Sequence, residues 1–175
     1  TWEECTPNGR IVLEIDPASS FGTGRHETTS LCLRALEKLK VENTAVLDMG
    51  CGSGILAIGA LKLGASNATL VDIDSVAASI AEDNLALNGV NQNAAVLCGN
   101  VLDNEALASR VFGTEYDIIL ANIVADIIKG MAPMFYSSLK LGGTLVCSGV
   151  IGGRREEVEK ALEEAGFTHL YTDED

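Results

Sequence analysis

The sequence predicts an α/β protein built on a doubly wound, mostly parallel sheet with helices on both faces. Short apolar runs alternate with longer segments of helical periodicity from Thr44 onward, which is the order of elements that produces parallel strands. The run 117–121 is nearly all apolar, as expected of a strand buried on both faces. A glycine-rich loop at 48–54 separates the first strand pattern from the first helix pattern. A ligand is therefore expected outside the carboxyl ends of the strands, where the strand order reverses.

The individual elements follow from apolar spacing and turn residues. Strands are predicted at 46–48, 68–71, 94–98, 117–121 and 144–147, and a further strand is expected to begin in 167–171. Helices are predicted at 55–63, 75–88, 124–139 and 154–165. Ser75 is expected to cap the second of these helices, and Pro133 to interrupt or bend the third. Gly64 and Gly166 are expected to end the first and the last.

Residues 1–43 differ in pattern from the rest of the chain. They contain an extended apolar run at 11–15, a lid-like loop with Pro17, and a helix from about Glu27 to Lys38. A length of 175 residues is typical of one domain. We therefore expect residues 1–43 to pack on the domain formed by 44–175 without forming a domain of their own.

The chain is strongly acidic, and this disfavours some kinds of partner. It has 25 Asp and Glu against 12 Lys and Arg, a formal net charge of −13. Nucleic acids and anionic membranes attract clustered cations, so direct binding to either is not expected, whereas a basic partner would be attracted. The same charge also serves plain solubility.

Cysteine usage and hydropathy indicate a reduced, cytoplasmic protein. The five cysteines are an odd number without any C-x-x-C pair, so neither a disulfide framework nor a metal site is expected. No apolar run approaches the length that spans a bilayer, and no charged-then-apolar leader opens the chain.

The glycine-rich loop 48–54 (D-M-G-C-G-S-G) carries the first functional signal. Glycines let the backbone turn tightly and approach a ligand, and the amino end of the following helix offers free N–H groups. Asp72 stands 22 residues after Gly50, at the end of the next predicted strand, where a carboxylate can accept hydrogen bonds from ribose hydroxyls. Asp74 would share its strand face, so either carboxylate could be the ligand, and the strand end favours Asp72. The alternative is a tight turn followed by aspartates that cap a helix.

The spacing of the glycines separates two kinds of nucleoside cofactor. Dinucleotide sites follow G-x-G-x-x-G, whereas Gly50, Gly52 and Gly54 are each separated by one residue. This variant resembles the first motif of S-adenosylmethionine-dependent methyltransferases, whose cofactor has no pyrophosphate. A sulfonium cation also suits an acidic pocket. A nicotinamide-dependent oxidoreductase built on the same sheet is the alternative.

Two further segments carry polar side chains suited to a transfer reaction. Asn122 follows the apolar strand 117–121, and its donor and acceptor groups could orient an amine lone pair toward a methyl group or could cap the next helix. The segment 21–29 places glycines, threonines and His26 before a helix, so Thr28 or Thr29 could donate a hydroxyl to a ligand beneath a folded loop. His26 could act as a base or as a structural hydrogen-bonding group.

Four motifs together resemble those of one family, the PrmA-type methyltransferases, which modify large-subunit ribosomal protein eleven. They are F-G-T-G-x-H-x-T-T at 21–29, D-x-G-C-G-S-G-I-L at 48–56, D-I-D at 72–74 and A-N-I at 121–123. The first and last motifs discriminate this family, while the other two are common to many methyltransferases. The resemblance runs from about Trp2 to Phe167.

This resemblance implies a Rossmann-like class I methyltransferase fold, S-adenosylmethionine as the cofactor, and protein-lysine N-methyltransferase activity. It implies methyl transfer to lysine side chains and an N-terminal α-amine of a basic, lysine-rich large-subunit ribosomal protein. It also implies that the family's N-terminal substrate-recognition domain is absent from this chain. Asn122 is the candidate catalytic residue. The candidate cofactor-binding residues, which include the three glycines of the loop, are Thr29, Gly50, Gly52, Gly54, Asp72 and Asn122.

The acceptor and the activity have alternatives at this point. Another amine or a small molecule could receive the methyl group. The chain could also be a cofactor-binding module whose catalysis depends on a partner or has been lost. Direct attack of a neutral amine on the methyl group requires no strong general base, and the sequence offers no obvious one.

Overall fold

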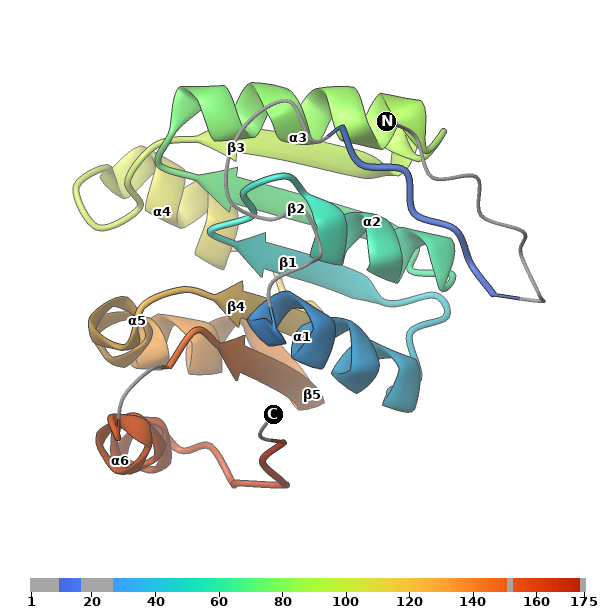
Figure 1. The fold of residues 1–175 in the computed structure, drawn as a ribbon. Coiled ribbons are helices and arrows are strands. Elements are labelled where there is room, and N and C mark those ends of the chain that lie inside the picture. Colours follow the sequence, from blue (N-terminus) through green and yellow to red (C-terminus); the bar gives the residue numbers. More distant parts are fainter. Residues whose placement is uncertain (1–9, 17–26, 151–152, 174–175) are drawn as a thin grey trace.

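The structure, a computed structural model, describes residues 10–16, 27–150 and 153–173 (Figure 1). Within these ranges five strands form one sheet: β1 (Ala45–Met49), β2 (Asn67–Asp72), β3 (Ala94–Cys98), β4 (Tyr116–Asn122) and β5 (Leu139–Ser148). Their order is β3-β2-β1-β4-β5, and every neighbouring pair is parallel. The predicted parallel sheet is confirmed, and the strand order reverses between β1 and β4.

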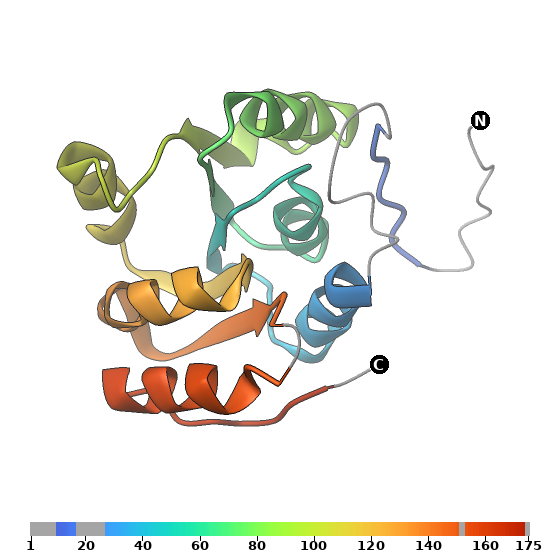
Figure 2. The same ribbon diagram turned by 60° about the vertical axis from the view of Figure 1, so that its left-hand side comes forward.

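Helices cover both faces of this sheet. In the described part of the chain they are α1 (Glu27–Lys38), α2 (Ile55–Lys62), α3 (Ser75–Leu87), α4 (Glu105–Phe112), α5 (Ala125–Ser138) and α6 (Arg155–Ala165). One face carries α1, α2 and α3, and the other carries α4 and α5, with α6 packed beside α5 (Figure 2). The sheet is therefore doubly wound, as predicted. None of the described helices is long and apolar enough to cross a membrane.

Side chains that alternate between the two faces along strands β1 and β4 contribute to the apolar cores on which the helices pack. Val46 and Leu120 belong to the core shared with α1, α2 and α3, whereas Leu47 and Ile119 belong to the core on the opposite face. Successive side chains of a strand point to opposite faces, and all four of these are fully buried. Packing on both faces of the sheet therefore holds β1 and β4 in place, and with them the residues that follow the two strands.

The starts of helices α3 and α4 differ from what the sequence predicts. Helix α4 has no counterpart among the predicted elements, because only Val111 of its eight residues is buried and the apolar periodicity is weak. Its cap was visible in the sequence, since Asn104 accepts a hydrogen bond from a backbone N–H of the first turn. For α3 the expected cap was wrong, because Asp74 rather than Ser75 accepts the bond, from the Val76 N–H at 2.8 Å.

Helix α5 and strand β5 differ from their predicted forms. Helix α5 is not interrupted at Pro133, which lies on its exposed side, where water can bond to the carbonyl that proline leaves without a donor. Strand β5 begins at Leu139, before the predicted 144. The glycine pair at 142–143 lies inside β5, and the register between β4 and β5 shifts in this region. An irregularity within a strand can have the same composition as a turn, so the sequence pattern placed the start of β5 after these glycines.

The strand expected to begin in 167–171 is not formed. Phe167 packs edge-on against Tyr136 of α5, with ring centroids 5.2 Å apart. The chain then continues toward α1, where the Lys38 ammonium lies 2.8 Å from the Asp173 carboxylate. Ring packing and an ion pair thus replace the strand pairing that the apolar pattern suggested.

A hydrogen bond from the buried Tyr116 hydroxyl holds the end of α4 to the sheet, and removing that hydroxyl tests its contribution to stability. The Tyr116 hydroxyl donates a hydrogen bond to the Val111 carbonyl at 2.9 Å in the buried core. Tyr116→Phe leaves that carbonyl without its donor, so we expect the free energy of unfolding to fall by about 1 kcal/mol in urea denaturation. Tyr136→Phe removes the same group from a side chain that is 50% exposed and should change stability by less than about 0.5 kcal/mol. Equal losses in the two variants would contradict this assignment.

Candidate functional site

The candidate residues meet at the carboxyl edge of the sheet, where the strand order reverses. Strands β1 and β4 are neighbours with Met49 opposite Ala121, so the glycine loop and Asn122 follow side by side. Asp72 ends β2 on the other side of β1, and α1 brings Thr29 to Asn122. Ligands of open α/β sheets bind at this edge, so the candidate residues lie together where the sequence predicts a ligand.

The glycine loop needs its glycines for both conformation and space. Gly50, Gly52 and Gly54 have φ values of 71°, 52° and 78°, in the region that side chains disfavour. A Cβ atom on Gly50 would clash with Cγ2 of Ile123. The Gly50 N–H also donates to the Val71 carbonyl at 2.8 Å. The loop is therefore wrapped closely over the ends of β1 and β2.

The structure distinguishes the two candidate aspartates. Asp72 lies against the loop, where its Oδ2 accepts a hydrogen bond from the Gly52 N–H at 2.9 Å. Its Oδ1 accepts from the Asp74 N–H at 3.0 Å, and each oxygen has a second lone pair for a ligand. Asp74 instead caps α3 through its own carboxylate. The geometry favours Asp72 as the ligand-facing carboxylate.

Asn122 is joined to Thr29 across a large distance in sequence. Its Nδ2 donates to Thr29 Oγ1 at 3.4 Å, with 93 positions separating the residues, and Thr29 is only 3% exposed. The alternative role as a helix cap is not supported, because the cap position of α5 is Val124, without a side-chain cap bond from the described residues. A Cβ on Gly149 would lie 3.3 Å from Asn122 Oδ1. The missing side chain thus leaves room beside that oxygen.

Asp48 is a buried carboxylate with one unsatisfied oxygen. Its Oδ2 accepts a hydrogen bond from the Ala57 N–H at 3.0 Å, in the first turn of α2, where the cap residue Gly54 has no side chain. Its Oδ1 has no partner among the described residues. Burial, aided by the charge of Asp72, raises the pKa of Asp48 from 3.8 to about 7. An unpartnered buried carboxyl oxygen of this kind favours a cation or a strong donor as its neighbour.

The thiols around the site are not nucleophiles. Burial raises the pKa of both Cys32 and Cys147 to about 12, and it also raises the pKa of Cys51. These groups remain protonated at neutral pH, and the thiolate is the reactive form. The cysteines that the structure describes are all free. The described residues as a whole contain no cluster of His, Cys, Asp or Glu suited to a metal ion.

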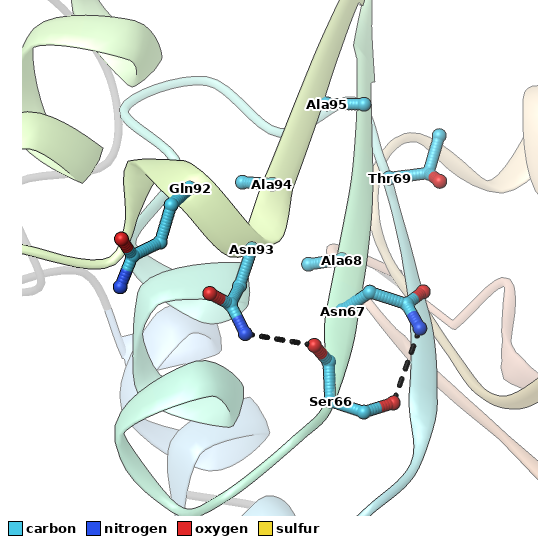
Figure 3. Close-up of a pocket in the computed structure, with 8 residues that line it drawn as sticks. All are labelled: Ser66, Asn67, Ala68, Thr69, Gln92, Asn93, Ala94 and Ala95. Atoms are coloured by element: carbon cyan, nitrogen blue, oxygen red, sulfur yellow. Dashed lines mark hydrogen bonds between the residues drawn. The ribbon is translucent and has the colours of Figure 1, made fainter.

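Two hollows in the described surface lie away from this edge. One, of about 340 Å³, lies at the amino ends of β2 and β3, where the Asn93 amide donates to the Ser66 carbonyl at 3.0 Å (Figure 3). The other, of about 250 Å³, lies at the amino end of β4 beside Thr44 and Asp117. Neither contains a candidate residue, so neither competes with the carboxyl edge as the functional site.

Some candidates could not be placed, and one group of residues was missed. His26 and the lid-like loop 17–26 lie outside the described residues. Asn84 and Asn88 were not among the predicted site residues, yet they bond to Ser53 of the glycine loop and to the segment 10–16. Two asparagines one turn apart inside a helical pattern were the available signal, because Asn is a poor helix former.

Two solved structures with a similar arrangement of elements are those of a ribosomal protein methylase and an RNA methyltransferase. The crystal structure of ribosomal protein L11 methylase from Lactobacillus delbrueckii subsp. bulgaricus matches with a TM-score of 0.83 and 34% identity, covering 95% of this chain and 82% of that one. An RNA methyltransferase from Salinibacter ruber, in complex with S-adenosyl-L-homocysteine, matches with a TM-score of 0.57 and 18% identity over 67% of this chain and 73% of that one. The second likeness concerns the fold alone. The fold is the Rossmann-like fold of these enzymes.

Sequence relatives narrow the class to one family. The family model described as Ribosomal protein L11 methyltransferase (PrmA) matches residues 1–175. The ribosomal protein L11 methyltransferase of Bacillus pumilus (strain SAFR-032) is 43% identical over 95% of this chain, and that of Bacillus subtilis (strain 168) is 44% identical over 96%. This chain belongs to the family of ribosomal protein L11 methyltransferases. It spans about half the length of these relatives, 52% of each.

The raised pKa of Asp48 gives a prediction about stability. Between pH 4 and 7 the folded chain keeps a proton on Asp48 that the unfolded chain has lost, so the free energy of unfolding falls as the pH rises through this window. The total loss is at most about 4 kcal/mol. Asp48→Asn cannot titrate, and we expect its stability to fall less between pH 5 and 8, measured by urea denaturation. Parallel stability curves for the two proteins would contradict the burial of a titrating group here.

Proposed function

We propose that this chain is the cofactor-binding and catalytic domain of an S-adenosylmethionine-dependent protein methyltransferase acting on amino groups of ribosomal protein L11. The observation that carries the proposal is the placement of the Asn122–Thr29 pair beside the glycine loop and Asp72. Membership of the family supports the same activity. We assign the catalytic domain to residues 44–175, with 1–43 as a preamble, and α1 of that preamble packs against β4 and β5.

The residues at the crevice fit a cationic nucleoside cofactor. When bound, S-adenosylmethionine supplies a methyl group on a positively charged sulfur. We assign Asp72 to the ribose hydroxyls, since two backbone N–H groups fix the orientation of its carboxylate at the strand end. The glycine loop, without side chains at Gly50, Gly52 and Gly54, allows close approach of the amino acid part. A cation bound beside the unpartnered oxygen of Asp48 would favour the ionised form of this carboxyl, whose pKa burial raises to about 7.

Asn122 is proposed to aim the acceptor amine. A lysine amine has a reference pKa of about 10.4 and must lose its proton before it can attack. Desolvation in the crevice favours the neutral form, and the Asn122 Oδ1 can accept an N–H of that amine. The bond from Asn122 Nδ2 to Thr29 holds the amide in one orientation. Orientation of this kind accounts for roughly 7–11 kcal/mol of barrier lowering in well-aligned systems.

The charge of the chain supports a basic protein as acceptor. A net charge of −13 attracts a lysine-rich partner and repels polyanions such as RNA. We propose lysine side chains and the N-terminal amine as the atoms that receive the methyl groups. A ribosomal acceptor also places the reaction in the cytoplasm.

Methyl transfer to defined acceptors tests the proposed function. The chain is incubated with isotopically labelled S-adenosylmethionine and purified ribosomal protein L11, and labelled positions are mapped by peptide mass spectrometry. Label is expected on lysine and N-terminal amines, and it should disappear when those amines are acetylated beforehand. Calorimetry distinguishes the proposed cofactor from a nicotinamide cofactor, because S-adenosylhomocysteine is expected to bind and NAD is not. Binding of NAD alone would replace the proposal with an oxidoreductase.

Asp72 and Asp74 provide a matched pair for the cofactor assignment. Asp72→Ala removes the proposed ribose ligand, and loss of hydrogen bonds to a charged group should weaken S-adenosylhomocysteine binding by at least about 10-fold in calorimetry. Asp74→Ala removes the α3 cap and should lower stability by about 1 kcal/mol with little change in affinity. Wild-type affinity of Asp72→Ala would exclude it as the ligand.

Asn122→Ala tests the transfer step itself. Misplacement of the acceptor amine should lower kcat roughly 100-fold, while calorimetry should still detect cofactor binding. Thr29→Val removes the hydroxyl that orients the Asn122 amide and should lower kcat by a smaller factor. Wild-type turnover by Asn122→Ala would remove Asn122 from the mechanism.

A further inference from the structure

Helix α3 carries two buried asparagines one turn apart. Asn84 is 1% exposed and Asn88, at the end of the helix, is 7% exposed. Asparagine is less favourable than alanine inside a helix, and a buried amide without partners costs free energy. Their retention at these positions therefore depends on hydrogen bonds to groups outside the helix.

Asn84 joins the glycine loop to the N-terminal segment 10–16. Its Nδ2 donates a hydrogen bond to the Ser53 carbonyl at 2.9 Å. Its Oδ1 accepts a hydrogen bond from the Asp16 N–H at 3.0 Å. One buried amide therefore contacts two backbone segments that are far apart in the sequence.

Asn88 holds the same segment as a neighbouring strand would. Its Oδ1 accepts from the Glu14 N–H at 3.0 Å, and its Nδ2 donates to the Glu14 carbonyl at 2.6 Å. The segment runs beside α2 and α3 in both views (Figures 1 and 2), and its Leu13 and Ile15 pack on the core. Glu14 and Asp16 thus bond to asparagines while Leu13 and Ile15 pack inward, which fixes the position of this part of the segment.

The loop is anchored at two successive residues. Asp72 accepts from the Gly52 N–H, and Asn84 donates to the carbonyl of Ser53, the next residue. Helix α3 also touches the loop directly, since a Cβ on Gly54 would lie 3.2 Å from the Ala81 Cβ. The orientation of the peptide group between Ser53 and Gly54 is therefore set by α3.

We propose that Asn84 is a positioning residue for cofactor binding, which holds the Ser53 carbonyl and couples the glycine loop to the segment 10–16. This inference rests on the proposed function, which supplies the ligand of the loop. Asn84 acts through the backbone of the loop and needs no contact with the cofactor. Occupation of the loop should then restrain residues 14 and 16, although they lie on the other side of Asn84.

Calorimetry with S-adenosylhomocysteine tests the positioning role. Asn84→Ala should weaken binding by about 5–30-fold, the equivalent of one or two buried hydrogen bonds. Tyr116→Phe is the control, because it also loses a buried hydrogen bond but at the amino end of β4, and it should bind as the wild type does. Wild-type affinity of Asn84→Ala together with a lowered Tm would show a structural role only and overturn the proposal. Absence of binding by the wild-type chain would instead overturn the proposed function.

Hydrogen exchange of the wild-type chain tests the coupling without any variant. The Glu14 and Asp16 amides donate to Asn88 and Asn84, so S-adenosylhomocysteine should slow their exchange. Unchanged exchange at both amides in a protein that binds the ligand would overturn the coupling, even if Asn84→Ala does not fold.

Discussion

The parallel pairing of β1 with β4 is the contact on which the rest of the molecule depends. With Met49 opposite Ala121, the glycine loop and Asn122 leave the sheet next to each other. Ile123 then occupies the space that a side chain on residue 50 would need, so only glycine fits there. The strand alternation that fills the two cores also sets this register. Packing and the candidate site are therefore consequences of a single pairing.

A second constraint is electrostatic. Asp48 is buried at the start of α2 and lies near the charge of Asp72. The Ala57 N–H and the positive end of the α2 dipole favour the ionised form of Asp48, but burial outweighs them and raises its pKa to about 7. The remaining oxygen is unsatisfied by the described residues. The fold thus retains a local cost at the edge where a cationic ligand is proposed to bind, which is a common relation between strain and function.

The parts that could be predicted from the sequence are those that depend on local pattern. The parallel sheet follows from the alternation of elements, and the ends of β1, β2 and β4 locate the glycine loop, Asp72 and Asn122. Long-range contacts could not be predicted in this way, because the partners of Asn84 are 31 and 68 positions away. The pattern in 167–171 suggested a strand, but Phe167 packs against a ring of α5 instead and Leu170 is exposed. The local pattern before α1 offered Thr28 or Thr29, and the family resemblance selected Thr29, since no local signal links α1 to β4.

The long sequence separation within the β1–β4 pair also has a kinetic consequence. Val46 pairs with Ile118, and pairings between residues so far apart in the chain form slowly. A folding chain that has joined only β1, β2 and β3 would already possess the glycine loop and Asp72 but would lack Asn122. A ligand that needs both sides of the crevice binds only the completed sheet, and at 100 times its Kd it would stabilise that state by about 2.7 kcal/mol. The cofactor would then select for chains that have finished folding.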